Sequence, residues 1–153
     1  KEYIMNRRNF LETSSKVACA CALGVGTLLL NNCSNPTEPY EPVDTSGLEL
    51  DFDLTNDGFV PLQIDGGSVT TGANAIDSSG LLLLRSGDSI KAFTRRCTHQ
   101  GGPINSFSGG SASCAWHGAQ FNANGQHVSG PGEGALKSYE TQLDGNILTV
   151  FGG

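Results

Sequence analysis

Residues 97–118 read CTHQGGPINSFSGGSASCAWHG, and this stretch contains two short motifs that each pair a cysteine with a histidine. In the first motif one residue separates Cys97 from His99, and in the second two residues separate Cys114 from His117. Thiolates and imidazoles are both metal ligands, and the glycines after each pair allow a backbone to fold closely around a bound group. The stretch therefore predicts two metal-binding loops.

On both sides of these motifs, short apolar runs alternate with turn residues, as in a β fold. Strands are expected over residues 48–54, 59–64, 81–84, 89–95, 137–143 and 146–151. The run over residues 81–84 is apolar throughout, which predicts burial on both faces, whereas Pro61 places the run around it at a sheet edge. Asp144-Gly145 is a hairpin signal between the last two strands. No sustained helical periodicity interrupts this pattern, so the predicted fold class is all-β.

Between residues 96 and 134 the strand pattern stops, and Gly, Ser and Asn dominate. A long irregular stretch inside a compact domain is usually functional, which agrees with the position of the two motifs.

The chain of 153 residues has 15 acidic and 9 basic residues, and its first 33 residues are net positive while the remainder is strongly acidic. This balance argues against a nucleic-acid-binding protein, which needs basic side chains to neutralise phosphates. Of five cysteines, only Cys97 and Cys114 lie beyond residue 33. A framework of disulfides is therefore excluded for the acidic part of the chain.

Residues 1–33 have the layout of an export signal. Arg7 and Arg8 precede an uncharged stretch over residues 17–30, and the whole resembles a twin-arginine signal. The alternative is a basic surface helix that leads into a buried one. The segment is expected to form an anchor helix, to be processed with lipidation at Cys33, or to be cleaved. All three outcomes place the rest of the chain outside the cytoplasm, and tethering at the membrane is preferred.

Residues 34–47 contain three prolines and several acidic residues, and they are expected to form an extended linker. The remaining residues, 48–153, are expected to form one domain.

This domain resembles the Rieske iron–sulfur family, whose signature is Cys-x-His-x-Gly followed by Cys-x-x-His-Gly. Beyond the four ligand positions, Gly101 and Gly118 match the family's loop glycines, and Gly130-Pro131-Gly132 stands where a proline loop shields the cluster. The resemblance implies an antiparallel β-sandwich or barrel with a small cluster-binding subdomain at about residues 96–134.

The resemblance also implies one [2Fe–2S] cluster per chain, with its ligands on two different irons. Cys97 and Cys114 would bind one iron, and His99 and His117 would bind the other. Neutral imidazoles in place of two thiolates raise the reduction potential. A structural zinc ion held by the same Cys2His2 set is the alternative, as are four unrelated buried side chains. His127, which lies outside both motifs, is expected to be an ordinary surface histidine.

Departures from the family pattern bear on the potential. High-potential members link their two loops by a disulfide, and the matching positions here are Gly102 and Trp116. Those members also supply hydroxyl donors where this chain has Ala119 and Phe121. The resemblance therefore implies a missing bridge and a potential in the lower half of the roughly −150 to +300 mV range of Rieske centres. Packing by Trp116 and Phe121 is expected to replace the disulfide.

The implied function is electron transfer rather than catalysis by this chain alone. The preferred role is the exported, membrane-tethered iron–sulfur subunit of a quinol-oxidising complex of cytochrome bc type. Its partners would be a cytochrome b-type membrane subunit, a cytochrome c-type or other acceptor, and quinol. The alternatives are a ferredoxin-like donor to an oxygenase and the small subunit of a periplasmic oxidoreductase such as arsenite oxidase. The acidic domain would favour a basic docking face on the acceptor.

Overall fold

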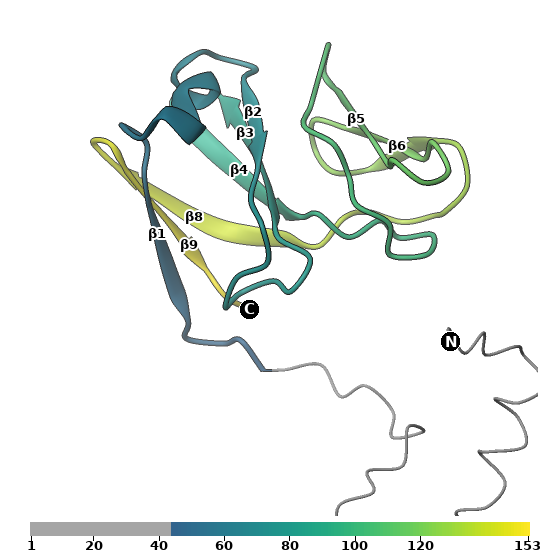
Figure 1. Cartoon of the computed structure of the whole chain (residues 1–153), viewed down its shortest axis with the longest axis horizontal. Helices are drawn as coiled ribbons and strands as arrows, with labels where there is room; N and C mark the ends of the chain where they lie inside the picture. Colours follow the sequence, from purple (N-terminus) through teal and green to yellow (C-terminus); the bar gives the residue numbers. More distant parts are fainter. Residues whose placement is uncertain (1–43) are drawn as a thin grey trace, which may run out of the picture. The chain divides into compact units, whose positions relative to one another are not determined.

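The structure is a computed structural model that describes residues 44–153, which form two antiparallel sheets and one short 3-10 helix (Figure 1). The larger sheet consists of β1 (Glu49–Asp53), β2 (Ser68–Thr70), β3 (Leu81–Ser86), β4 (Ser89–Thr94), β8 (Ser138–Asp144) and β9 (Ile147–Phe151). The smaller sheet consists of β5 (Ser111–Ser113), β6 (Gln120–Asn122) and β7 (His127–Ser129). The strand orders are β1-β9-β8-β4-β3-β2 and β5-β6-β7. The predicted all-β class is confirmed.

Strand β8 connects the two halves of the larger sheet. It pairs with β4 only through Ser138 and Tyr139, and with β9 over residues 140–144. The long, curved β8 in Figure 1 therefore passes from one half of the sheet to the other. The sheet curls around a first core, which consists of Leu54, Leu62, Val69, Ile76, Leu81, Leu83, Ile90, Ala92, Tyr139, Leu148 and Val150.

Strand β3 is buried on both faces, as its four consecutive leucines predict. None of these leucines is more than 4% exposed. Because alternate residues of a strand point to opposite faces, Leu81 and Leu83 enter the first core while Leu82 and Leu84 enter a second one. The second core consists of Leu82, Leu84, Phe93, Cys97, Ile104, Phe107, Ala112, Cys114, Ala119, Phe121 and Leu136.

The two hairpins of the larger sheet both turn at a glycine, and the second lies where Asp144-Gly145 predicts it. Gly87 and Asp88 connect β3 to β4, and Gly145 and Asn146 connect β8 to β9. Gly87 has φ 59° and Gly145 has φ 57°, in the left-handed region where a side chain would be strained. These turns match the right-handed twist of the strands that they join.

The prediction of a strand over residues 59–64 is wrong. The chain instead forms the 3-10 helix η1 (Asp57–Gln63). Side chains three residues apart lie on the same face of such a helix, so Phe59 and Leu62 both turn toward the first core. Pro61 suggested an edge strand because it cannot donate to a ladder, but its fixed φ suits a short helix equally well.

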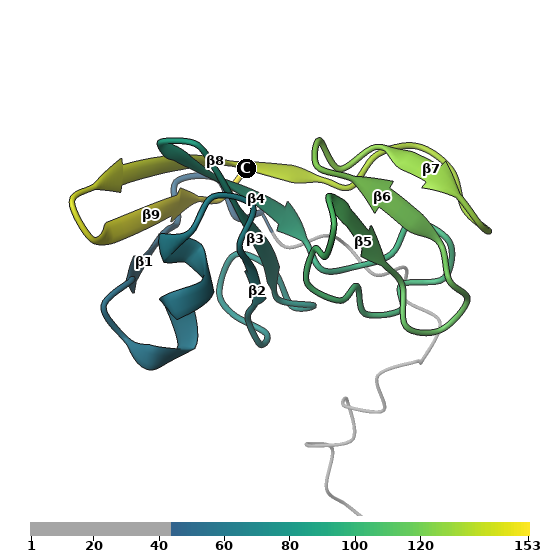
Figure 2. The same cartoon turned by 90° about the horizontal axis from the view of Figure 1, so that it is seen from above.

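Residues 96–134, which were expected to be irregular, contain the three strands of the smaller sheet. Each of these strands has only three residues, which is too short to show a period of two. Figure 2 shows β5, β6 and β7 beside the larger sheet. Lys91 on β4 joins this segment to the larger sheet. Its Nζ donates to the carbonyl of Ala123 at 3.3 Å and to Oδ1 of Asn124 at 2.8 Å.

The described structure includes the last four residues of the expected linker. Thr45 is buried, and its Oγ1 donates to the carbonyl of Gly153 at 3.2 Å. The expected export signal and anchor, with the rest of the linker, lie outside the described residues.

A buried hydrogen bond joins β8 to the loop before β3. The Tyr139 hydroxyl donates to Oδ2 of Asp77 at 2.9 Å, and both residues are buried. Burial and the Asp77 carboxylate raise the pKa of Tyr139 well above its ordinary value, so the hydroxyl keeps its proton. The same carboxylate accepts the N–H of Ser79, which fixes the loop.

The variant Tyr139→Phe is expected to lose about 1–2 kcal/mol of unfolding free energy, because a buried carboxylate would lose a donor that water cannot replace. Urea denaturation of the full chain, followed by far-UV circular dichroism, measures this loss. Thr149→Val is the control, since it removes the exposed hydroxyl that donates to Asp51 at 2.7 Å. Equal losses in both variants would contradict the structural importance of the buried bond.

Candidate metal centre

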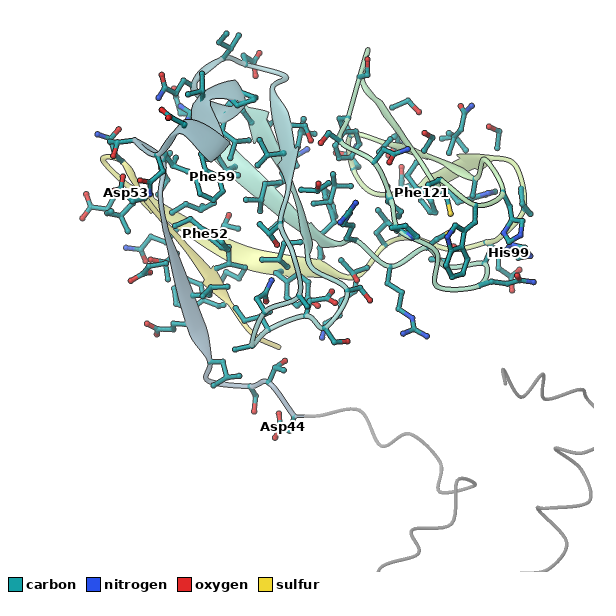
Figure 3. All side chains as sticks on the ribbon, viewed as in Figure 1. Asp44, Phe52, Asp53, Phe59, His99 and Phe121 are labelled. Atoms are coloured by element: carbon teal, nitrogen blue, oxygen red, sulfur yellow. The ribbon has the colours of Figure 1, made fainter. Side chains whose placement is uncertain are left out.

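Two loops hold the four predicted ligands. The first Cys/His loop, residues 97–102, follows β4, and the second Cys/His loop, residues 114–119, connects β5 to β6. Their bases are joined, because the N–H of Ala115 donates to the carbonyl of Pro103 at 3.0 Å. Figure 3 shows His99, from the first loop, at the edge of the described domain, on the side of the smaller sheet.

The two loops close in the same way, although their sequences differ. The N–H of Cys97 donates to the carbonyl of Gly102 at 2.9 Å, and the N–H of Cys114 donates to the carbonyl of Ala119 at 2.8 Å. Each hydrogen bond spans five residues and begins at the cysteine. The two thiols are therefore presented by backbone turns of equal size.

The glycine four residues after each cysteine is required by this closure. Gly101 donates its N–H to the carbonyl of Cys97 at 2.9 Å, and Gly118 donates to that of Cys114 at 3.1 Å. Both glycines have φ 73°. Only glycine adopts this left-handed conformation without strain, which explains why both motifs contain it at the same distance from the cysteine.

The two thiols are buried at the bottom of the loops, where they are 3% and 4% exposed. Burial raises the pKa of the Cys97 thiol, against the N–H groups of His99 and Gln100 that point at its sulfur. Burial opposes ionisation of Cys114 as well. The N–H groups of Trp116 and His117 and the Cys97 thiol donate to its sulfur, however, and the pKa of Cys114 is lowered. Inward-pointing N–H groups stabilise the thiolate form, which is the form that binds metal.

The two imidazoles lie on the exposed side of the same loops. Nδ1 of His99 is 3.3 Å from Nδ1 of His117, and the ring centroids are 4.9 Å apart. Two imidazole nitrogens bound at about 2.0–2.1 Å to one tetrahedral metal ion stand about 3.4 Å apart. The pair is therefore spaced as two ligands of one ion would be.

A third segment covers both loops. An added Cβ on Gly130 would lie 2.8 Å from Cα of Ala119 in the second loop, and one on Gly132 would lie 3.3 Å from the backbone N of His99 in the first. The segment around Pro131 therefore contacts both loops at a distance that favours glycine. This is the place that the sequence assigned to a shielding proline loop.

The positions that depart from the family pattern are packed rather than open. Ala119 and Phe121 are fully buried in the second core, together with the two thiols. Gly102 lies directly under the indole of Trp116, whose side chain is 58% exposed. No hydroxyl stands at residues 119 and 121, so these two side chains supply no donor to a bound group.

His127 is not the exposed surface histidine that the sequence predicts. Its ring is half-buried and packs edge-on against Phe121, with centroids 5.7 Å apart. Its Nε2 is buried and has no hydrogen-bond partner among the residues that the structure describes. Its position on β7, opposite Phe121, could not be inferred because that strand has only three residues.

The segment that carries the candidate metal centre has few charged side chains. Between residues 96 and 134 the only acidic residue is Glu133 and the only basic one other than histidine is Arg96. Asp44 and Asp53, which Figure 3 labels, lie on the larger-sheet side, far from His99. Most acidic residues of the domain therefore lie outside this segment, and the basic docking face on the acceptor stays a prediction.

The four predicted ligands come together as two pairs, one of sulfur and one of nitrogen. In the described part of the chain, no group of three or more His, Cys, Asp or Glu side chains is arranged around one ion. Paired thiols behind paired imidazoles suit a centre of two metal ions with different ligands. This donor set fits a [2Fe–2S] cluster bound by two thiolates and two imidazoles.

Comparison with known proteins agrees with this chemistry. The profile of the Rieske [2Fe-2S] domain matches residues 61–140. Carotenoid phi-ring synthase of Chlorobaculum tepidum is 37% identical over 71 residues, which are 46% of this chain but only 11% of that protein. The chain thus spans about a tenth of the length of this relative.

Two solved structures are also similar. The plasma membrane Rieske protein PetC3 from Synechocystis PCC 6803 is 29% identical, with a TM-score of 0.49 over 64% of this chain and 90% of that one. The ferredoxin of carbazole 1,9a-dioxygenase from Nocardioides aromaticivorans IC177 is 19% identical, with a TM-score of 0.47 over 59% and 88%.

Because the matched domain covers more than half of its residues, this chain belongs to the Rieske [2Fe-2S] family, whose members carry a [2Fe–2S] cluster.

Proposed function

We propose that the chain is the exported, membrane-tethered electron-transfer subunit of a quinol-oxidising complex of cytochrome bc type. The observation that carries its electron-transfer role is the arrangement of two exposed imidazoles in front of two buried thiols. A bound cluster would supply reversible one-electron chemistry at this place. Since electron transfer needs close approach, a centre with two exposed imidazoles suits a carrier that docks on a partner.

The four side chains have different tasks in this proposal. Cys97 and Cys114 hold the inner iron, and the N–H groups aimed at their sulfurs offset the negative charge in a buried site. His99 and His117 hold the outer iron through Nδ1. The Nε2 of each exposed ring then remains available to exchange a proton with solvent or to accept a hydrogen bond from quinol.

The sequence before residue 44 supports the membrane tether and the export of the chain. Arg7 and Arg8 with the following apolar stretch support export of a folded protein, and the prolines within residues 34–43 support a linker. In residues 44–153 there is no helix long and apolar enough to span a bilayer. The proposed partners are a cytochrome b-type subunit and a cytochrome c-type acceptor.

A second candidate is a ferredoxin-like donor to an oxygenase. It is favoured by Gly102 and Trp116 where high-potential members have cysteines, and by Ala119 and Phe121 where they have hydroxyls. A low potential would suit a donor that reduces an oxygenase.

An electron paramagnetic resonance spectrum of the dithionite-reduced full chain tests the cluster. A Rieske signal, with a low average g and broad anisotropy, is expected, because two imidazole ligands on one iron separate the two iron sites electronically. A silent protein that contains zinc instead would overturn the proposal.

The three histidines of the chain supply a matched control for the ligand assignment. His99→Gln and His117→Gln are each expected to abolish the signal, since each removes a proposed ligand. His127→Gln is expected to keep it, because that ring packs on Phe121 and lies outside both loops. Retention of the signal in either ligand variant would contradict the assignment.

The two candidate functions differ in how the native chain behaves in cell fractions. A respiratory subunit is expected to stay with membranes after a carbonate wash and to co-purify with a cytochrome b. A soluble protein that purifies alone in the cytoplasmic fraction would rule out the respiratory role and favour the ferredoxin role.

The reduction potential depends on donors near the cluster, and Ala119→Ser would add one hydroxyl at a position where high-potential members have serine. A hydrogen bond about 1–2 kcal/mol stronger in the reduced state raises a one-electron potential by roughly 40–90 mV. Protein-film voltammetry is expected to show this rise from a wild-type value in the lower half of the family range. Ala123→Ser, outside both loops, is the control, and an unchanged potential in Ala119→Ser would contradict the argument.

A further inference from the structure

We propose that Trp116 is a positioning residue that holds the two Cys/His loops together by packing on Gly102. In other members of the family a disulfide joins the two loops at these two positions. Here the noncovalent contact has the same role. The inference rests on the proposed ligand assignment, because it concerns how ligands from two loops are kept in register.

Any residue with a side chain at position 102 would prevent the indole from approaching this closely. A Cβ added to Gly102 would lie 2.7 Å from Cδ2 of Trp116, and 2.9 Å from its Cε3 and Cγ. Real Cβ atoms essentially never approach other atoms this closely. The indole therefore lies directly on the backbone of Gly102, which is buried, while the rest of the ring faces solvent.

Gly102 is needed for space and not for its backbone conformation. Its neighbour Gly101 has φ 73° and must be glycine, whereas the φ of Gly102 lies outside the left-handed region. The three atoms nearest to a Cβ at position 102 all belong to the indole, so the indole is what excludes alanine there. The glycine and the tryptophan thus form a matched pair.

The relative position of the two loops is what remains to be controlled. Each loop is closed internally by its own hydrogen bond from the cysteine N–H. The bond from Ala115 to Pro103 joins them at the base, and the segment around Pro131 contacts both. Farther out, the indole of the second loop rests on the last residue of the first, which keeps the thiol pair and the imidazole pair aligned.

This arrangement is independent of thiol chemistry. Both cysteines in the described residues are proposed iron ligands, and both are free. Reductants that cleave a disulfide would leave the Trp116–Gly102 contact intact. Cluster retention in the wild-type protein is therefore expected to be the same with and without a phosphine reductant.

Trp116 is the only tryptophan of the chain, so tryptophan fluorescence reports on the surroundings of this one residue. The first measurement compares the full-length, cluster-loaded wild type with Gly102→Ala. The added methyl group is expected to displace the ring, to shift its emission to longer wavelength and to increase quenching by acrylamide. The rate at which visible cluster absorbance is lost to an iron chelator is expected to rise about tenfold, as for the loss of an aromatic packing contact.

A double-mutant cycle isolates the contact from other effects of the substitutions. Trp116→Ala alone is expected to release the cluster about as fast as Gly102→Ala, and the double variant no faster than either, because the methyl group then meets no ring. Trp116→Phe is expected to restore much of the retention. Val128→Ala, which truncates another exposed apolar side chain, on β7 of the smaller sheet, is the control and is expected to behave as wild type.

Replacing both residues by cysteine provides a rescue. The oxidised G102C/W116C variant is expected to retain its cluster like wild type, and to lose it like Trp116→Ala after reduction. Additive rates in the cycle, unchanged fluorescence in Gly102→Ala, or two cysteines that do not cross-link would each overturn the proposal. Should Trp116→Ala not accept a cluster, Gly102→Ala and Trp116→Phe decide the matter. A wild type without a Rieske signal would refute the proposed function, whereas the fluorescence comparison would still test the contact.

Discussion

The burial of strand β3 on both of its faces is the constraint on which the rest of the structure depends. Leu81 and Leu83 fill the core inside the curled sheet, and Leu82 and Leu84 fill the core that contains the two thiols. At about 25 cal/mol per Å2 of apolar surface, neither pair could be exposed without a large cost in stability. One strand therefore couples the stability of the larger sheet to that of the smaller sheet and the two Cys/His loops.

The second core explains how a segment with so few apolar residues can be ordered. Cys97, Cys114 and Phe121 are part of that core, so the thiols are placed by the same packing that excludes water from them. Backbone N–H groups then replace water as donors to the sulfurs. The imidazoles remain outside because they follow the cysteines by two and three residues, on the outer side of each turn.

Prediction from the sequence succeeded where a pattern was local and strong. The leucines of β3 marked a buried strand and Asp144-Gly145 marked a hairpin, and the β class followed. The strand expected over residues 59–64 was wrong because Phe59 and Leu62 need only a period of three to share a face, which a six-residue run does not distinguish from a strand. The strands of the smaller sheet were missed because three residues carry no period.

The sequence by itself determined the chemistry of the candidate centre. Two thiols, two imidazoles and a glycine four residues after each cysteine specify the donors and the closure of each loop, since both depend on contacts within six residues. Only the tertiary structure decided how the loops meet: the Nδ1 atoms 3.3 Å apart, the indole on Gly102, and the proximity of Gly130 and Gly132 to opposite loops. The burial of His127 Nε2 also became clear only then. These features join residues far apart along the chain, and a linear sequence does not encode such distances directly.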